Sequence, residues 1–233
     1  MQNITTFLRR THNLLALIVG AQVLIWVASG FFFALRPIEE VRGEHLRTLP
    51  QETLPEAEMA APETILAAAG EPVKTLRLKN WLGAPVWEAE TASGKRLYDG
   101  VTGARLDPVT EESARKVAED RWVGDGELVA LSLIEAAPSE AGRGAGRPMW
   151  RAEFEGRDNA SLWIDPQDGE LVAVRTDWWR TFDLFWGLHI MDWTNRETIS
   201  SWWMKLFAFG SLVLSLAGIW LVVDRLIKGR LLR

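Results

Sequence analysis

Two long stretches without a charged residue constrain this chain more than any other feature. Residues 13–35 and 206–223 contain no Asp, Glu, Lys or Arg. The apolar run 14–35 has 22 residues and the second stretch has 18. An α-helix needs roughly 20 residues to cross a hydrocarbon core of about 30 Å. We therefore predict two transmembrane helices, at 14–35 and 204–223.

A cleaved signal peptide is the alternative interpretation of the first stretch, with Arg9 and Arg10 as its basic region. The apolar region of a signal peptide is about 7 to 15 residues long and ends in small residues. Here Phe31, Phe32 and Phe33 occupy that end, which favours a retained anchor.

The charges around the two stretches predict the orientation of the chain. Cations flank both stretches on the side of the chain ends: Arg9, Arg10, Arg225, Lys228, Arg230 and Arg233. Because cytoplasmic flanks are enriched in Lys and Arg, we expect the tails 1–13 and 224–233 in the cytoplasm. Between Arg36 and Lys205 there are 20 Lys and Arg against 30 Asp and Glu, a net charge of −10. This middle part is expected outside, which for a bacterial inner membrane is the periplasm.

Composition excludes several functional classes. The chain has no Cys, which excludes disulfides, thiol catalysis, iron–sulfur clusters and covalently attached haem. The acidic middle lacks the basic stripe that nucleic acid requires, so we expect no nucleic-acid partner. The sequence contains no GxSxG or HExxH motif and no paired Ser/His/Asp arrangement. We therefore assign no catalytic residue and expect a protein that is not an enzyme.

The acidic middle contains an internal repeat. Its two copies begin with the Trp-centred segments 86–90 and 149–153. In each copy an Asp follows, with a Gly four residues later, at Asp99 to Gly103 and at Asp165 to Gly169. Alternation with aromatic residues, broken by Asp and Gly, is typical of antiparallel strands joined by tight turns. Asp caps such a turn and Gly supplies its positive φ.

A helix-like run precedes each copy, at 62–69 and at 110–119. The second run opens with Thr and early Glu residues, a typical helix start. We expect an α+β fold, with helix-plus-antiparallel-meander units at 62–108 and 109–176 between the two transmembrane helices. Residues 36–61 are predicted to be a linker.

These features resemble a known family. The order of elements in each copy resembles the PepSY domain: a helix, a strand centred on Trp or Tyr, and a turn that runs from an aromatic residue and Asp to Gly. In this chain the turns are Tyr98-Asp99 to Gly103 and Trp163-x-Asp165 to Gly169. Histidines near the ends of flanking helices, as in Arg10-Thr11-His12-Asn13 and Trp186-Gly187-Leu188-His189, resemble PepSY-associated transmembrane proteins, across most of residues 7–225. The resemblance implies tandem extracytoplasmic modules that bind or inhibit partners. Larger, multi-span relatives are linked to haem and to iron or siderophore reduction, and this chain departs from them in having two spans.

The three histidines limit how haem b, the candidate cofactor, could bind. His12 and His189, the candidate ligands, flank opposite faces of the membrane, and about 22 helical residues separate those faces by roughly 30 Å. One copy therefore cannot bring both to one iron. His45, ten residues beyond Leu35, could reach the outer site, or a homodimer could pair each histidine with its symmetry mate. The alternative is that these histidines are structural.

An aromatic segment at 177–203 is predicted to be an amphipathic helix in the outer membrane interface. The aromatic residues expected to face a partner or the interface are Trp178, Trp179, Phe182, Phe185, Trp186, Trp193, Trp202 and Trp203. Asp192 lies three residues after His189 and is expected to orient its imidazole.

Small and polar residues in the spans are the predicted helix-packing positions: Ala16, Gly20, Gln22, Ser211, Ser215 and Gly218. Small residues let helices approach closely in a membrane. Either the two spans pack on each other, or they pack on helices of a partner.

The function predicted from these features is that of a non-catalytic accessory or assembly subunit. Its outer domain and helices would dock on a larger inner-membrane complex, with a respiratory or other redox complex as the first choice. One alternative is a haem b electron carrier acting as a dimer. Another is a periplasmic peptidase inhibitor or envelope sensor.

Overall fold

The computed structural model describes residues 2–50 and 53–228 and consists of two compact units. The helical unit contains residues 2–37 and 181–228, and the sheet unit contains Ile38–Arg180. Arg230 and Arg233 lie outside the described residues, as does the side chain of Arg9. The contribution of these three cations to the predicted orientation therefore rests on the sequence alone.

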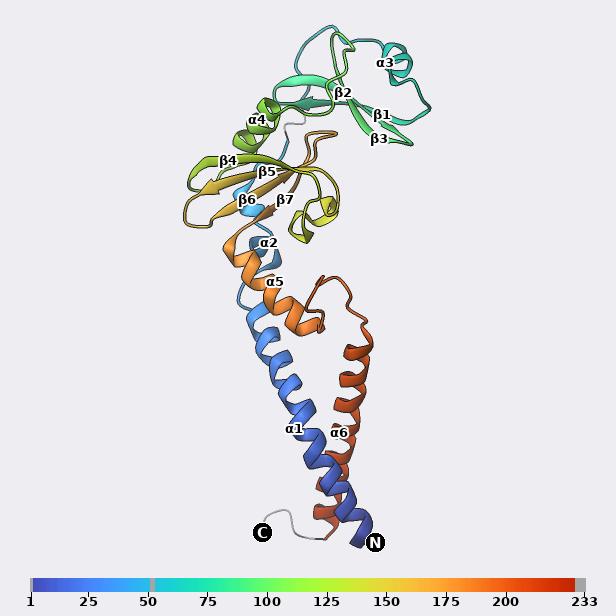
Figure 1. Cartoon of the computed structure of the whole chain (residues 1–233), viewed down its shortest axis with the longest axis vertical. Coiled ribbons are helices and arrows are strands. Elements are labelled where there is room, and N and C mark those ends of the chain that lie inside the picture. The colour runs from blue at the N-terminus through green and yellow to red at the C-terminus, as the bar shows by residue number, and fades with distance from the viewer. Residues whose placement is uncertain (1, 51–52, 229–233) are drawn as a thin grey trace. The chain divides into compact units, whose positions relative to one another are not determined.

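The helical unit is built from two long apolar helices, α1 (Gln2–Phe33) and α6 (Trp202–Ile227) (Figure 1). Both are long and apolar enough to cross a membrane, over Arg10–Phe33 and Trp202–Ile227. At 1.5 Å per residue, the 32 residues of α1 extend about 48 Å, so the helix continues beyond the predicted span at its N-terminal side. It ends at Phe33, two residues before the predicted end of the span.

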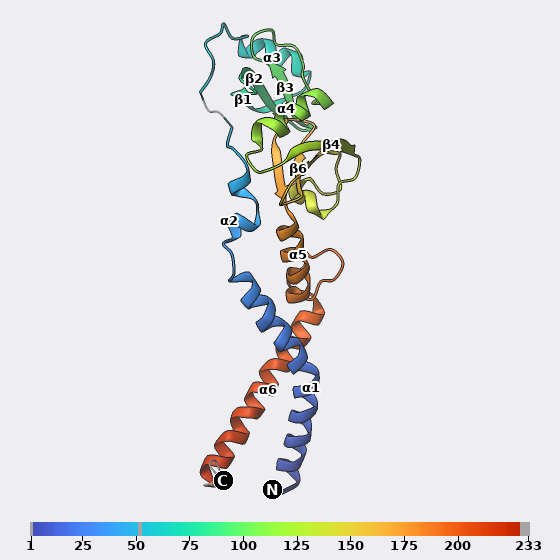
Figure 2. The same cartoon turned by 90° about the vertical axis from the view of Figure 1, so that its left-hand side faces the viewer.

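The two long helices cross within the helical unit (Figure 2). The start of α1 and the end of α6 lie at the same end of this unit. A Cβ built on Gly210 lies 3.1 Å from a methyl group of Val19, so a small residue permits this close contact. Val19, Gln22 and Ser29 are buried on α1, whereas none of the residues of α6, all described, is buried.

Helix α5 (Asp177–Ile190) occupies only the first part of the predicted segment 177–203. Met191 follows it with a φ of 56°, a left-handed conformation that ends the helix. The chain then forms a loop, and Ser201 caps α6 by accepting a hydrogen bond from the Met204 N–H at 3.2 Å. The aromatic residues of the segment are thus divided between α5, the loop and the first turn of α6.

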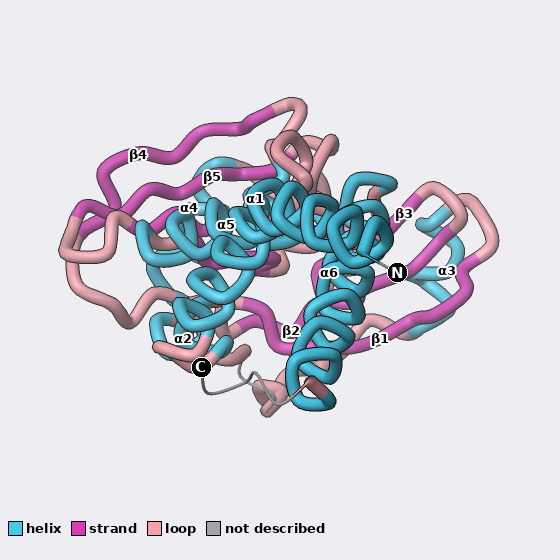
Figure 3. The backbone as a smooth tube through the Cα atoms, turned by 90° about the horizontal axis from the view of Figure 1, so that it is seen from below, coloured by secondary structure: helices cyan, strands magenta, loops and turns pink. Residues whose placement is uncertain are grey.

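The sheet unit has the predicted α+β fold, with two antiparallel meanders. The first half has α3 (Pro62–Ala69) and a sheet in the order β1 (Val73–Trp81), β2 (Ala84–Thr91), β3 (Gly94–Asp99). The second half has α4 (Glu111–Arg121) and a sheet in the order β4 (Glu127–Ile134), β5 (Met149–Glu155), β6 (Ala160–Ile164), β7 (Leu171–Arg175). Short helical segments complete the unit: α2 (Ile38–Val41), η1 (Glu44–Leu46) and η2 (Ser139–Gly144). Among the described residues, Figure 3 shows strands in this unit only.

The two repeated turns have the same geometry, which confirms their predicted role. The Gly103 N–H bonds to the Asp99 carbonyl at 2.9 Å, and the Gly169 N–H bonds to the Asp165 carbonyl at 2.9 Å. Both glycines have the positive φ that the turn requires, 72° and 65°. Each Asp carboxylate also accepts a hydrogen bond from the backbone N–H two residues later.

The halves are joined by a shared core. Val86 and Leu97 of the first half form one buried cluster with Val109 and Ala114. Partly buried side chains from both halves, Trp81, Leu131 and Trp150, pack against this cluster. An ion pair adds to the contact, because the Lys95 ammonium lies 2.7 Å from the Asp168 carboxylate. The two copies of the repeat therefore pack against each other through a common cluster and an ion pair.

The predicted linker, 36–61, is in part a packed segment of the sheet unit. Val41 and Leu46 are buried, and Leu46 belongs to the core cluster beneath α4. The Thr48 N–H donates to the Arg121 carbonyl at 2.9 Å, and the Ala60 N–H donates to the Gly100 carbonyl at 2.7 Å. Two apolar side chains in a polar stretch thus anchor it, because their burial removes apolar surface from water.

Candidate functional site

An aromatic contact between α5 and the end of α1 is the densest side-chain cluster of the helical unit. The rings of Phe32 and Phe185 stack with centroids 4.3 Å apart. The Phe33 ring lies 4.7 Å from Phe182 and 6.1 Å from Trp186. Three of the predicted α5 aromatic residues therefore face α1, within the protein's own fold. Such aromatic pairs stabilise the contact beyond the area that they bury.

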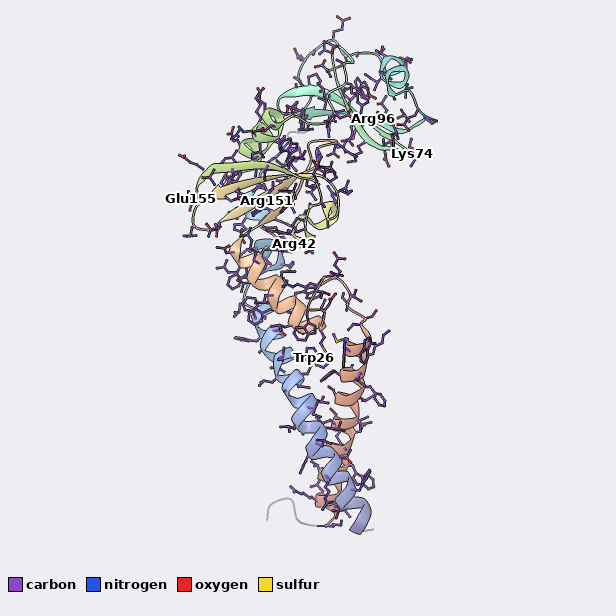
Figure 4. The ribbon with its side chains drawn as sticks, viewed as in Figure 1. Trp26, Arg42, Lys74, Arg96, Arg151 and Glu155 are labelled. Atoms are coloured by element: carbon purple, nitrogen blue, oxygen red, sulfur yellow. The ribbon has the colours of Figure 1, made fainter. Side chains whose placement is uncertain are left out.

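His189 lies at the edge of this cluster. Its ring packs edge-on against Phe33 at 5.3 Å, and its backbone carbonyl accepts a 2.7 Å hydrogen bond from the indole N–H of Trp26. Figure 4 labels Trp26 on α1, near the C-terminal end of α5. Two side chains of α1 thus hold the last turn of α5 in place.

One ring nitrogen of the His189 imidazole is hydrogen-bonded, and the other has no hydrogen-bond partner among the described residues. Its Nδ1 lies 2.8 Å from the hydroxyl of Ser29, and that hydroxyl donates its proton to the Ile25 carbonyl at 2.7 Å. The hydroxyl therefore accepts from Nδ1–H, which leaves the lone pair on Nε2. Burial lowers the pKa of His189, so the neutral ring is favoured. A neutral His with a held Nδ1–H is the form that ligates iron.

Asp192 does not have the orienting role predicted for it. Its carboxylate accepts hydrogen bonds from backbone N–H groups of its own loop: Thr194, Asn195, Glu197 and Thr198. These bonds lower the pKa of Asp192 to about 2, with the Thr198 N–H as the largest cause. Ser29 is the orienting partner of His189 instead. A contact between distant segments is not visible in local spacing, and that is why the sequence pointed to Asp192.

The loop that carries Asp192 is also fixed to α5. The Trp186 indole N–H donates to the Arg196 carbonyl at 3.1 Å, and Arg196 pairs with Asp183 at 2.5 Å. Trp193, Trp202 and Trp203 remain exposed, with the last two stacked on each other at 3.7 Å. Trp178 and Trp179 are half-buried in the sheet unit, where Trp179 stacks under the guanidinium of Arg175 at 4.3 Å.

His12 lies far along α1 from the His189 contact. A Cβ built on Gly218 is 3.4 Å from its Nε2, so His12 faces α6. His12 and Ser29 are 17 residues apart on one helix, a rise of about 26 Å. The prediction that one copy cannot bring His12 and His189 to the same iron therefore fits this geometry. His45 is an exposed residue of η1 in the sheet unit.

One copy of the chain therefore cannot supply both His12 and His189 as axial ligands of a single haem iron. Within the described residues, no group of three or more His, Asp or Glu could hold a metal ion. A cavity of about 500 Å³ adjoins His12, lined also by Asn13, Gly218, Leu221, Val222, Asp224 and Arg225. It brings no second histidine to His12.

The predicted helix-packing residues have different surroundings. Gly218 faces His12, and Gln22 is 6% exposed with a buried Nε2 that has no hydrogen-bond partner among the described residues. A Cβ on Gly20 would meet nothing within 4 Å, and the half-buried Ala16 lies one helical turn before it. The hydroxyls of Ser211 and Ser215 bond to carbonyls four residues earlier in α6. Contact between the two spans therefore accounts for Gly218, while packing of Gly20 on a partner helix stays a prediction.

The outer edge of β4 is a feature that the sequence reasoning missed. Strand β4 is the edge of the four-stranded sheet and pairs only with β5 among the described strands. No charged residue lies between Glu127 and Glu135, and Val129 and Leu133 are 56% and 41% exposed. An uncharged run of seven residues, 128–134, rich in Leu, Val and Ile was the available signal. Exposed apolar edges of this kind are templates for another strand.

Comparison with known proteins gives one family. Residues 9–233 match the family described as the PepSY-associated TM region. No curated protein and no solved structure matches the sequence. The match extends over the sheet unit, over α6 and over α1 from residue 9 onward.

Proposed function

Because this chain belongs to the PepSY-associated transmembrane family, we propose that it is a non-catalytic accessory subunit that docks on a larger membrane complex. The match confirms the resemblance predicted from the repeated turns and the flanking helices, and the chain is a membrane protein with two transmembrane helices. In the proposal, the helical unit anchors the protein in a bacterial inner membrane. The sheet unit recognises the partner in the periplasm.

The open edge of β4 is the observation that supports docking. The other edge of the same sheet is covered, since Gly43 lies against Val174 of β7. The edge strand β1 of the first sheet carries three cations, Lys74, Arg77 and Lys79, a common protection against unwanted pairing. Strand β4 has neither a cover among the described residues nor a central charge. A β-bulge after Leu128 leaves a regular ladder from Ala130 to Ile134 for a new strand.

The proposed occupant of this edge is an extended segment of a different protein, added as a further strand. Its side chains at alternate positions would be apolar, to cover Leu131 and Leu133 on one face of the sheet. A second copy of this chain is a poorer occupant, because each copy carries a net charge of −10 between Arg36 and Lys205. A neutral or basic partner strand avoids that repulsion.

A matched pair of edge variants tests the proposal. Ala130→Lys places a cation on β4 opposite Glu153, and Thr75→Lys places one on β1 opposite Glu90. Both new cations face a carboxylate within their own sheet, so both variants should fold. Charge at the centre of the edge disfavours strand addition at β4 alone.

The measurement is quantitative mass spectrometry of what co-purifies with the full-length tagged protein from native membranes in mild detergent. We expect a membrane complex in stoichiometric amount with the native chain and with Thr75→Lys, and at least about a ten-fold loss with Ala130→Lys. Equal recovery with both variants, or no stoichiometric partner of the native chain, would contradict docking through β4.

The orientation proposed here has its own test. Both termini are proposed to lie in the cytoplasm, because both tails are basic and cytoplasmic flanks are enriched in Lys and Arg. A protease added outside intact spheroplasts should then digest the sheet unit and leave tags on both termini intact. Digestion of either tag from outside would overturn the orientation.

A haem b electron carrier is a second candidate, and the state of His189 favours it. The neutral ring presents Nε2 for ligation, and the missing second ligand would be His189 of another copy in a symmetric dimer. Haem bound there would supply one-electron transfer. Protein purified from the native host should then show a Soret band that His189→Ala abolishes and His12→Ala retains. Colourless native protein would exclude this candidate.

A further inference from the structure

We propose that a cationic pocket at the β7 edge of the sheet unit binds the phosphate group of an anionic phospholipid. The pocket has a volume of about 230 Å³ and lies between the segment 42–47 and residues 172–175 of β7. Three of its lining side chains are Arg42, Arg47 and Arg175, and the ring of Trp179 forms part of its wall. Figure 4 labels Arg42 in the sheet unit, on the segment that covers β7. This site is separate from the β4 edge, at the opposite edge of the same sheet.

The three arginines stand out against the charge of their surroundings. The stretch from Arg36 to Lys205 has a net charge of −10, so a cluster of three cations is not expected by composition. Within the described residues, neither Arg42 nor Arg47 has a carboxylate within 4 Å. The one acidic lining residue is Glu44, so the pocket keeps an excess of positive charge. Guanidinium groups are well suited to phosphate because they donate parallel hydrogen bonds.

The pocket wall that β7 forms is held by several side-chain contacts. Arg175 donates to the Glu140 carbonyl at 2.8 Å and to the Val174 carbonyl at 3.1 Å. Its guanidinium lies over the Trp179 ring at 4.3 Å from the centroid. Trp179 is itself held, since its backbone N–H donates to the Thr176 hydroxyl at 3.2 Å. Arg175 and Trp179 therefore shape the pocket, while Arg42 and Arg47 supply its uncommitted cations.

One sequence separation and one lining residue favour a lipid over free phosphate as the source of the phosphate group. Arg42 is seven residues beyond the predicted end of the first span at Leu35. An extended chain of that length covers no more than about 25 Å, so connectivity limits how far Arg42 can lie from the end of the span. The pocket also includes a Trp, and Trp is enriched at the headgroup level of a membrane. Anionic lipids attract arginines near the membrane surface.

The test is lipid binding to the full-length protein in detergent, followed by native mass spectrometry. The probes are phosphatidylglycerol, phosphatidylcholine and inorganic phosphate. Arg42→Gln/Arg47→Gln removes the two uncommitted cations. Lys74→Gln/Arg77→Gln makes the same change of charge on β1 and serves as the matched control.

We expect the pocket variant to bind phosphatidylglycerol at least about ten-fold more weakly and the control variant to remain within about two-fold of the native chain. Glu44→Gln should strengthen binding, because it removes the only lining carboxylate. A folding defect would not strengthen binding, so this variant keeps the outcome interpretable.

Three results would overturn the proposal. One is equal weakening by both double variants, which would show a general effect of charge. Another is equal binding of phosphatidylglycerol and phosphatidylcholine. The third is saturation by inorganic phosphate without binding of either lipid, which would assign the pocket to a soluble phosphate.

Discussion

The two halves of the sheet unit have the same turns and different edges. Asp99 and Asp165 cap equivalent turns, and each half has one helix over an antiparallel meander. The first sheet has three strands and a cationic edge at β1, whereas the second has four strands and an edge, β4, without a charged residue after Glu127. The difference shows that the repeat keeps what a meander needs in order to fold, while its edges are free to serve binding.

Both proposed binding features adjoin the sheet of the second half, although Arg42 and Arg47 of the pocket lie on the segment that precedes the first half. The docking edge is β4, and the phosphate pocket adjoins β7, the opposite edge of the same sheet. The first half contributes to the shared core through Trp81 and Leu97. We therefore expect the first half mainly to stabilise the fold, while the sheet of the second half contributes to binding.

The largest expected effect comes from the cores. Leu97 belongs to the cluster shared by both halves, and Trp163 belongs to a cluster within the second half. We expect roughly 2–5 kcal/mol of destabilisation from Leu97→Ala and roughly 3–5 kcal/mol from Trp163→Ala. Hydrogen exchange of the full-length protein, read by peptide, should show lost protection in both halves for Leu97→Ala. It should show loss mainly in β4–β7 for Trp163→Ala.

If Trp163→Ala also removes protection from β1–β3 to the same extent, the two halves unfold together. That result would contradict the expectation that the second half can open separately. Val101→Ala is a suitable control, because Val101 is 48% exposed in a turn. It should leave the protection of both halves unchanged.

A smaller effect is expected at the ion pair between the halves. Lys95→Met leaves the Asp168 carboxylate, whose side chain is 3% exposed, without its cation. Because Lys95 itself is partly exposed, the expected loss is about 1–3 kcal/mol in the free energy of unfolding, below that of a fully buried pair. Lys74→Met, which removes an exposed cation of β1, should cost less than about 0.5 kcal/mol. Thermal unfolding in detergent, followed by circular dichroism, measures both, and equal melting temperatures would contradict the bridging role of Lys95.

The smallest effect is expected at the turns. Asp99→Ala and Asp165→Ala each remove side-chain caps and should cost about 1–2 kcal/mol. Hydrogen exchange should show the loss in the half that carries the substituted turn. A loss of protection that is confined to the opposite half would contradict independent turns.

A pH titration sharpens the test for the first turn. Hydrogen bonds from the backbone and side chain of Thr102, with that from the backbone as the largest cause, lower the pKa of Asp99. A lowered carboxylate pKa contributes stability that is present above the unfolded value, about 3.9, and is lost as pH falls through the folded value. Protection of the 99–103 turn should therefore fall on acidification below about pH 4. In the control variant Asp99→Ala, the protection of this turn should not depend on pH. An equally steep loss of protection in that variant would show that the Asp99 carboxylate is not the titrating group.

Several features of this protein could be predicted because they depend on residues close in sequence. The charge-free runs predicted membrane-spanning helices, because a charged residue in the hydrocarbon core is costly and such segments therefore lack charges. The spacing of Asp99 and Gly103 required a tight turn, because only nearby backbone groups take part in it. The repeat of that turn at Asp165 required a second meander. None of these features depends on contacts between segments that are distant in sequence.

Other features depended on contacts between distant segments and could not be predicted in that way. Ser29, 160 residues away, holds the ring of His189, so the partner is not the nearby Asp192. The predicted linker is in part a packed segment because Leu46 reaches the core beneath α4.

Local spacing and composition therefore determined the two long helices, the repeated turns and the antiparallel meanders. Tertiary structure alone decided which edge of the sheet stays open and which side chains surround each candidate site. The physical reason is that hydrogen bonding within an element is local, whereas an edge is open or covered according to how remote parts of the chain pack.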